Sequence, residues 1–196
     1  MIILRVNQEN LKEIVEIAAK SIKQGKVIVC PTDTVYGLIG DATNKKAVEK
    51  IFKIKKRPKN KPLPIFVKDL AQAKKLAKIN KKQEKFLKSA WPGNITVVLE
   101  AKKGVKLHTI YQNTIGVRMP DFKMLNILLK RLCRPLAETS VNISGQPSLT
   151  EIKKITTQFK NRKCQPDLII DAGNLKTSKP STVIDLTGKK NKILRK

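Results

Sequence analysis

Residues 10–30, NLKEIVEIAAKSIKQGKVIVC, contain two periodicities that decide the fold class. Apolar residues recur at helical spacing at Leu11, Ile14, Val15, Ala18 and Ile22. Gly25 follows as a typical helix stop, and the apolar run 27–30 has the length of a short buried strand. The chain is therefore predicted to open as strand, helix, strand.

The same alternation continues to the C-terminus. Helices are predicted at 45–55, 69–78, 80–90, 123–132 and 150–159, and strands at 63–67, 95–100, 114–119, 136–141, 168–170, 182–186 and 192–195. Thr43 or Asn44 is a candidate cap for the first of these helices. Alternating strands and helices without internal repeats predict one α/β domain over residues 1–196, with a twisted mixed sheet flanked by helices.

Charge is the most unusual feature of the composition. The chain has 42 lysines and arginines against 15 aspartates and glutamates, a formal net charge of +27, which favours nucleic acid or nucleotide as a partner. A lysine-rich composition from an A/T-rich genome explains this charge equally well. The seven arginines are more informative, because a planar guanidinium matches carboxylates and phosphates. We expect Arg57, Arg118 and Arg195 to bind anionic groups.

Cysteine and histidine content argues against a metal centre. Cys30, Cys133 and Cys164 lie far apart without metal-ligand spacing, and His108 is the single histidine, so we predict reduced thiols and no metal held by the protein. No apolar run reaches the roughly 20 residues that span a bilayer, and the N-terminus lacks the pattern of a secretory signal. We therefore expect a cytoplasmic protein.

Two segments carry residues suited to ligand binding. PTDTVYGL, residues 31–38, follows the predicted strand 27–30 and places polar groups where open α/β sheets bind ligands, although a turn rich in capping residues explains it equally well. KIKKRPKNKPL, residues 53–63, is a basic loop stiffened by two prolines and suited to polyphosphate; a solvated helix terminus is the alternative. Neither GxGxxG nor GxxxxGK[ST] occurs, so any ATP site is of another kind.

These two segments, taken with five others, resemble the YrdC-like family of threonylcarbamoyl-AMP synthases. The family pattern includes a lysine and an arginine separated by one residue, here Lys55 and Arg57. WPGNIT at 91–96, TIGVRMP at 114–120 and TSVNISG at 139–145 are similar to its WPGPxT, TVxVRxP and TSANxSG motifs. PSTVID at 180–185 and ILR at 193–195 match its closing elements. The matches occur in the expected order from residue 25 to residue 195.

The resemblance implies a YrdC-like fold of the short, single-domain type with one large basic cleft. Carried over position by position, it places Thr34, Arg118, Ser140 and Ser181 around threonine, with Arg118 on the carboxylate. It places Arg57, Lys61, Thr114, Asn142, Ser148 and Arg195 on ATP. Lys55 and Arg57 would act on the phosphates during catalysis. Tyr36 would shape the cleft wall, with packing in the core as the alternative.

The resemblance also implies the reaction, which is that of a nucleotidyltransferase. Threonine and bicarbonate form a carbamate that attacks the α-phosphate of ATP, giving threonylcarbamoyl-adenylate and pyrophosphate for modification of a tRNA adenosine beside the anticodon. Both steps bring anions together, so fixed cations would lower the barrier. Mg²⁺ is expected as the ion carried with ATP, and threonylcarbamoyl transferase proteins acting on tRNA as partners. Contact with tRNA or double-stranded RNA would fit the charge.

Two residues depart from the family motifs. Asn94 replaces a usual proline and would loosen a turn, and Val141 replaces a usual alanine and would crowd the ligand-lining loop.

Two other functions are alternatives to the synthase. A non-catalytic RNA-binding YrdC-like protein is the first, although the low aromatic content of 4% leaves few residues for stacking bases. The related carbamoyl-transfer module of hydrogenase maturation is the second, but it is found within a much larger chain.

Overall fold

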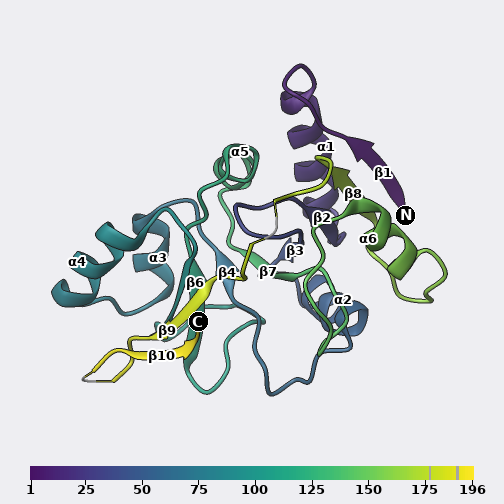
Figure 1. Ribbon diagram of the computed structural model, residues 1–196. Helices are drawn as coiled ribbons and strands as arrows, with labels where there is room; N and C mark the ends of the chain where they lie inside the picture. Colours follow the sequence, from purple (N-terminus) through teal and green to yellow (C-terminus); the bar gives the residue numbers. More distant parts are fainter. Residues whose placement is uncertain (177, 189) are drawn as a thin grey trace.

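The computed structural model describes residues 1–176, 178–188 and 190–196 (Figure 1). The helices are α1 (Leu11–Lys23), α2 (Lys45–Lys55), α3 (Leu70–Leu76), α4 (Lys81–Ala90), α5 (Lys123–Leu132) and α6 (Ile152–Phe159). The strands are β1 (Ile2–Arg5), β2 (Ile28–Cys30), β3 (Gly37–Asp41), β4 (Ile65–Phe66), β5 (Ile95–Glu100), β6 (Thr114–Arg118), β7 (Leu136–Ser140), β8 (Leu168–Asp171), β9 (Thr182–Asp185) and β10 (Lys192–Arg195).

The strands form one mixed sheet in the order β1-β8-β2-β3-β7-β4-β6-β5-β9-β10. Strand β8 runs parallel to β1 and β2, and β4 and β6 are parallel to each other, as are β5 and β9. The pairs β2–β3, β3–β7, β4–β7, β5–β6 and β9–β10 are antiparallel. The predicted α/β class with a mixed, helix-flanked sheet is therefore confirmed.

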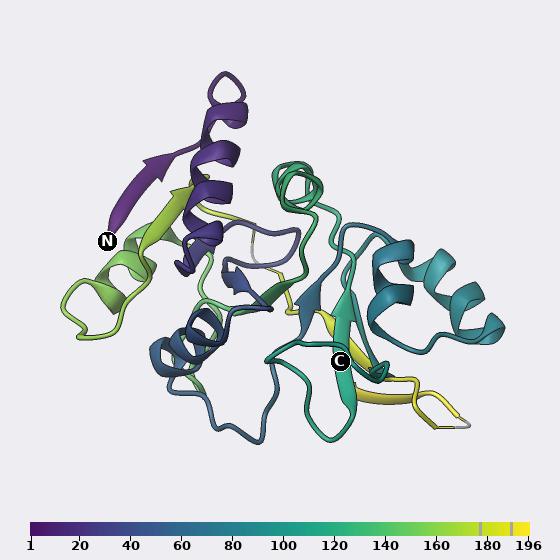
Figure 2. The ribbon, with the colours of Figure 1, turned by 180° about the vertical axis from the view of Figure 1, so that it is seen from behind.

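Helices cover both ends of the sheet. Figures 1 and 2 show α1 beside β1 and β8 at one end, and α3 and α4 beside β6 and the β9–β10 hairpin at the other. Helices α1 and α5 bury Val15, Ile22, Leu125 and Leu128 in one apolar cluster. Because each fully buried side chain of this kind contributes about 1.5–3 kcal/mol, this packing holds the helices against the sheet. None of the helices in the described part of the chain has the length and apolar character needed to cross a bilayer.

Several local signals act as the sequence predicts. The bounds of α2, α5, β5 and β10 match the predicted ranges. Asn44, and not Thr43, caps α2, since its side chain accepts from the backbone nitrogen of Ala47 at 3.1 Å. Asp69 and Asn80 cap α3 and α4 in the same way.

Strand β3 is a difference from the sequence prediction, which has no strand at Gly37–Asp41. Two glycines and an aspartate within five residues give this segment low strand propensity and no alternation. The strand forms because tertiary packing outweighs propensity: all five residues are buried between β2 and β7. A Cβ atom on Gly40 would lie 3.3 Å from Cδ1 of Ile51, so this position leaves little room for a side chain.

Candidate active site

A cavity of about 590 Å³ lies where loops from both halves of the sheet meet. Its walls come from the loop after β2, the C-terminal end of α2 and the basic loop after it, the end of β6, the end of β7 with its following loop, and β10. Six lysines and arginines and one glutamate line it: Lys55, Lys56, Arg57, Lys61, Arg118, Arg195 and Glu138. The cavity therefore has the charge to hold a polyanion.

Lys55 projects from the last turn of α2 into the loop after β7. Its Nζ donates to the backbone oxygen of Ser140 at 2.7 Å and to Oδ1 of Asn142 at 2.6 Å. Burial, followed by the nearby Arg57 guanidinium, lowers the pKa of Lys55 to about 7, and Glu138 opposes this shift. The backbone nitrogen of Ser144 donates to the Lys55 carbonyl at 2.8 Å, so helix and loop are joined through this one residue.

Arg57 shapes the basic loop from within. Helix α2 ends at Lys55, and the next residue, Lys56, adopts the left-handed conformation with φ of 50°. Nε of Arg57 donates to the Lys61 carbonyl at 2.7 Å, and its NH2 donates to the Pro62 carbonyl at 3.0 Å. Burial lowers the pKa of Arg57, and Glu138 opposes this. The loop is thus closed on itself and presents Arg57 and Lys61 to the cavity.

Arg118 ends β6 and is 2% exposed. Its NH2 forms an ion pair with Oδ1 of Asp33 at 2.6 Å, and its Nε donates to the Gly93 carbonyl at 2.9 Å. NH1 lies 3.5 Å from Oγ1 of Thr34, and the guanidinium carbon lies 5.6 Å from the centre of the Phe66 ring. These contacts fix the guanidinium plane, and Arg118 is one of the residues that line the cavity.

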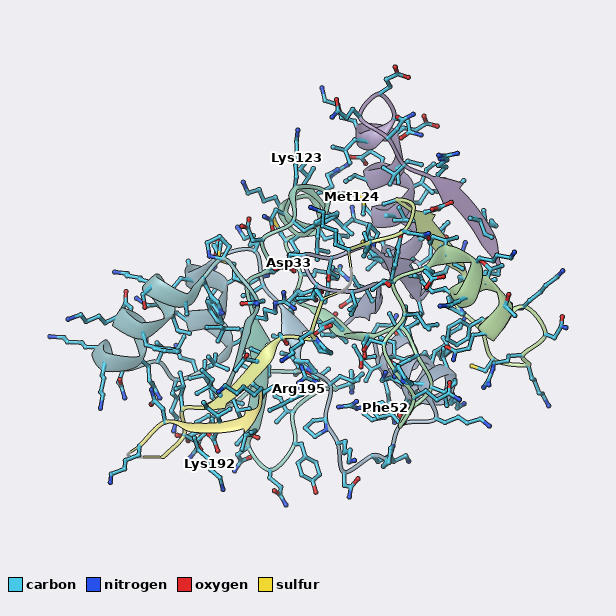
Figure 3. All side chains as sticks on the ribbon, viewed as in Figure 1. Asp33, Phe52, Lys123, Met124, Lys192 and Arg195 are labelled. Carbon is cyan, nitrogen blue, oxygen red and sulfur yellow. The ribbon has the colours of Figure 1, made fainter. Side chains whose placement is uncertain are left out.

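Ser181 and Arg195 join the last two strands to the site. Nε and NH2 of Arg195 donate to the Ser181 carbonyl at 3.1 and 2.6 Å, and Oγ of Ser181 lies 2.8 Å from Oγ1 of Thr96. Burial lowers the pKa of Arg195, and Glu138 again opposes the shift. Figure 3 shows Arg195 near the middle of the molecule, with Asp33 above it, whereas Lys192 of the same strand lies at the edge.

The structure brings together every residue predicted to bind a substrate or to act in catalysis except Thr114. The predicted residues that line the cavity are Thr34, Lys55, Arg57, Lys61, Arg118, Ser140, Asn142, Ser148, Ser181 and Arg195. Thr114 begins β6, four residues before Arg118, and its Oγ1 donates to the Tyr111 carbonyl at 2.8 Å. Strand alternation puts it on the same face as Arg118, but it does not belong to the cavity lining.

Tyr36 and Val141 differ from expectation. The predicted place of Tyr36 on the cleft wall is wrong: the side chain is fully buried, and its hydroxyl donates to the Gly173 carbonyl at 2.7 Å. Tyr36, the residue before β3, therefore ties the start of this strand to the loop after β8. Val141 is also fully buried in the apolar core, so it does not crowd the cavity lining. The carbonyl of Asn94 accepts from Thr182 at 3.0 Å, which anchors the turn at this departure.

Glu138 is a cavity residue that sequence reasoning missed. It lies on β7 two residues before Ser140, on the same face by strand alternation, and is 9% exposed. Burial raises its pKa, and Arg118 is the strongest of four cations that oppose the shift. The sequence did contain a signal for this residue, namely a glutamate inside the predicted strand 136–141. Because glutamate is seldom buried unless it is paired, a glutamate in such a strand indicates a functional site.

The fold and the cavity define an α/β protein with a cationic ligand site built from dispersed loops. A family model described as Sua5/YciO/YrdC, telomere recombination, matches residues 20–196, and the chain belongs to that family. It is 38% identical over 184 residues to a putative threonylcarbamoyl-AMP synthase of Methanocaldococcus jannaschii, which covers 94% of this chain and 86% of that protein.

Solved structures agree with the family assignment. Sua5 of Pyrococcus abyssi, solved in complex with L-threonine, superposes with a TM-score of 0.87 and 38% identity over 99% of this chain and 56% of that one. YciO of Escherichia coli superposes with a TM-score of 0.87 and 28% identity over 100% of this chain and 94% of that one. This chain thus spans little more than half of the Pyrococcus protein and nearly all of YciO.

Proposed function

We propose that this protein is a threonylcarbamoyl-AMP synthase, which forms threonylcarbamoyl-adenylate and pyrophosphate from L-threonine, bicarbonate and ATP. The observation that carries the proposal is the convergence of residues from separate loops on one cationic cavity of about 590 Å³. Sites for ligands of this size usually have volumes of about 300–1,000 Å³. The relatives named threonylcarbamoyl-AMP synthase and the threonine complex of the Pyrococcus protein support the same reading.

The threonine end of the cavity is the one around Arg118. Asp33 and Gly93 hold the Arg118 guanidinium in a fixed plane, which favours binding of a carboxylate through two parallel hydrogen bonds. Thr34, Ser140 and Ser181 would contact the remaining threonine atoms from three different segments of the chain. Because these side chains are positioned by strand ends, binding would cost little reorganisation.

The nucleotide end is formed by the basic loop after α2 and by β10. Arg57, Lys61 and Arg195 would bind the phosphates, and Asn142 and Ser148 the rest of ATP. Lys55 would add charge beside the α-phosphate as the carbamate oxygen attacks and pyrophosphate leaves. Fixed cations stabilise the developing negative charge without reorganising, which is the largest contribution that such a site makes to the rate.

Mg²⁺ would enter this site with ATP. The described residues contain no group of three or more His, Cys, Asp or Glu side chains that could hold a metal ion. The cavity offers one carboxylate, Glu138, among six basic side chains, so phosphate oxygens are better ligands than the protein. When bound, the ion would neutralise charge on the departing pyrophosphate.

The product would be passed to a threonylcarbamoyl transferase acting on tRNA in the cytoplasm. The formal charge of +27 supports electrostatic attraction of tRNA or double-stranded RNA to the same protein. The non-catalytic RNA-binding alternative is less well supported, because an RNA binder has no need for a guanidinium fixed beside Thr34 inside a cavity. Relatives named as synthases also favour the enzyme.

Pyrophosphate release tests the proposal. The purified protein is incubated with ATP, Mg²⁺, bicarbonate and L-threonine, and each component is omitted in turn. We expect release only when all of them are present. Release without threonine, or none in the complete mixture, contradicts the proposed function, and tight tRNA binding without threonine binding favours the alternative.

A further inference from the structure

The carboxyl group of Glu138 has no hydrogen-bond or ion-pair partner among residues 1–176, 178–188 and 190–196. Its backbone is tied down, since the nitrogen donates to the Pro64 carbonyl at 3.0 Å. Its side chain lines the cavity and is largely buried. Other carboxylates, by contrast, have ion-pair partners: Asp167 with Lys50, Glu16 with Arg131, and Asp41 with Arg134. A carboxylate left without a donor inside a ligand cavity is a site for a donor that the ligand brings.

The sheet register places Glu138 on the same face of the sheet as Arg118, two strands away. Arg118 on β6 is opposite Phe66 on β4, and Phe66 is opposite Leu136 on β7, so Arg118 and Leu136 share a face of the sheet. Glu138, two residues further along β7, lies on that same face. Consistently, Arg118 is the cation with the strongest effect on the Glu138 carboxyl, ahead of Arg195, Lys55 and Arg57.

An arginine and a glutamate on one face of the sheet match the two charged ends of an amino acid. The substrates of the proposed reaction include only one cationic group, the ammonium of threonine; bicarbonate and the phosphates of ATP are anions that a carboxylate repels. With the threonine carboxylate on Arg118, the ammonium would lie on the Glu138 side of the cavity.

We propose that Glu138 binds the ammonium group of the amino-acid substrate and accepts its proton, which makes the nitrogen nucleophilic. This proposal rests on the proposed function. The ammonium proton passes to the carboxylate, and the nitrogen lone pair forms a bond to the carbon of bicarbonate. A C–O bond of bicarbonate breaks, and its oxygen leaves as water with the hydroxyl proton and one proton from nitrogen. The carbamate that remains attacks the α-phosphate of ATP, and Glu138 returns its proton to solvent.

The environment suits a base of this kind. Burial raises the pKa of Glu138, which strengthens it as a proton acceptor. Arg118, Arg195, Lys55 and Arg57 oppose that rise and favour the ionised form in which the group must start. These are the charged groups that face it from β6, β10, α2 and the basic loop.

Two matched variants test the proposal in the full-length protein. Glu138→Gln keeps the shape and removes the charge, and Glu100→Gln makes the same change on β5 at an exposed glutamate paired with Lys78. Binding of L-threonine and of 3-hydroxybutanoate, which lacks the amino group, is measured by calorimetry for each protein. We expect the preference of the wild type for threonine to fall by about tenfold or more in Glu138→Gln and to be kept in Glu100→Gln.

The pH profile separates proton transfer from simple attraction. We expect adenylate formation by Glu138→Gln at pH 7 to be slower by about 100-fold or more, which is the usual contribution of a positioned base. We also expect the rate of the Glu138→Gln variant to rise by about tenfold per pH unit below the pKa of the substrate amine. Without the carboxylate, only the fraction of threonine that has already lost its ammonium proton to the solvent can react. The wild-type rate should depend less steeply on pH, and circular dichroism checks that each variant is folded.

The outcomes are distinguishable. A wild-type protein that makes no adenylate refutes the proposed function. A wild type that makes it, together with a Glu138→Gln variant that keeps the threonine preference and the wild-type pH profile, refutes the role of Glu138 alone. A change confined to ATP affinity or to the Mg²⁺ requirement also overturns it, since Glu138 would then serve only to balance charge or to hold the metal.

Discussion

At pH 8 we expect the wild-type protein to take up a proton when it binds ATP, and we expect Lys55→Gln to abolish this uptake. Lys55 is 3% exposed, and burial with the neighbouring Arg57 lowers its pKa to about 7. At pH 8 only about one tenth of the free protein therefore carries a proton on this amine. A bound triphosphate brings negative charge beside the amine and raises its pKa.

The size of the effect follows from these values. If the bound pKa rises past 9, ATP binding at pH 8 takes up about 0.8–0.9 proton. Linkage then requires ATP affinity to fall by about fivefold from pH 7 to pH 8, since binding favours the protonated form, which becomes scarcer as pH rises through 7. Below pH 6 Lys55 is already protonated, and its uptake vanishes.

Calorimetry in two buffers of different ionisation enthalpy measures the proton number directly. ATP is titrated into wild type, Lys55→Gln and the control Lys56→Gln, which removes an exposed lysine of the same cavity. We expect uptake by the wild type and the control and none by Lys55→Gln. ATP binding without proton uptake by the wild type, or equal uptake by Lys55→Gln, would refute the assignment of Lys55 to the phosphates.

Three further substitutions test separate parts of the account. Arg118→Ala should raise the threonine concentration for half-maximal adenylate formation by about 100-fold, because the carboxylate loses a charge-assisted contact. The ATP concentration for half-maximal formation should change by less than about threefold. Steady-state kinetics that show equal shifts for both substrates would contradict this. Arg57→Ala should slow pyrophosphate release by about 100-fold or more, and an unchanged rate would remove the basic loop from the mechanism. Asn44→Ala, which removes the cap of α2, should lower the free energy of unfolding by about 1 kcal/mol in urea titrations, and an unchanged midpoint would show that the cap is not stabilising.

Most elements were predictable because their signals are local. Helix α2 combines an apolar stripe with a cap at Asn44 and a left-handed end at Lys56, and its predicted bounds are those observed. Strand β3 was not predictable in this way, since Gly37 and Gly40 argue against a strand until β2 and β7 enclose it. Its position depends on contacts far apart in sequence.

The site was predictable where its residues occur in family-like motifs. The motif that contains Arg118 and the motif that contains Thr34 each gave a residue that the structure places in the cavity. No motif revealed that Asp33 holds Arg118, because that ion pair joins β6 to a loop 85 residues away. Glu138 lay outside the quoted motifs, and its place on the same face as Arg118 arises from the β6–β4–β7 register.

If one cavity joins threonine, bicarbonate and the α-phosphate of ATP, all three contribute atoms to a single product. Mass spectrometry of the product formed with ¹³C-bicarbonate detects this. We expect an adenylate that contains threonine and is heavier by one mass unit than the product from ordinary bicarbonate. An adenylate without the label, or threonine and ATP recovered unchanged, would contradict it.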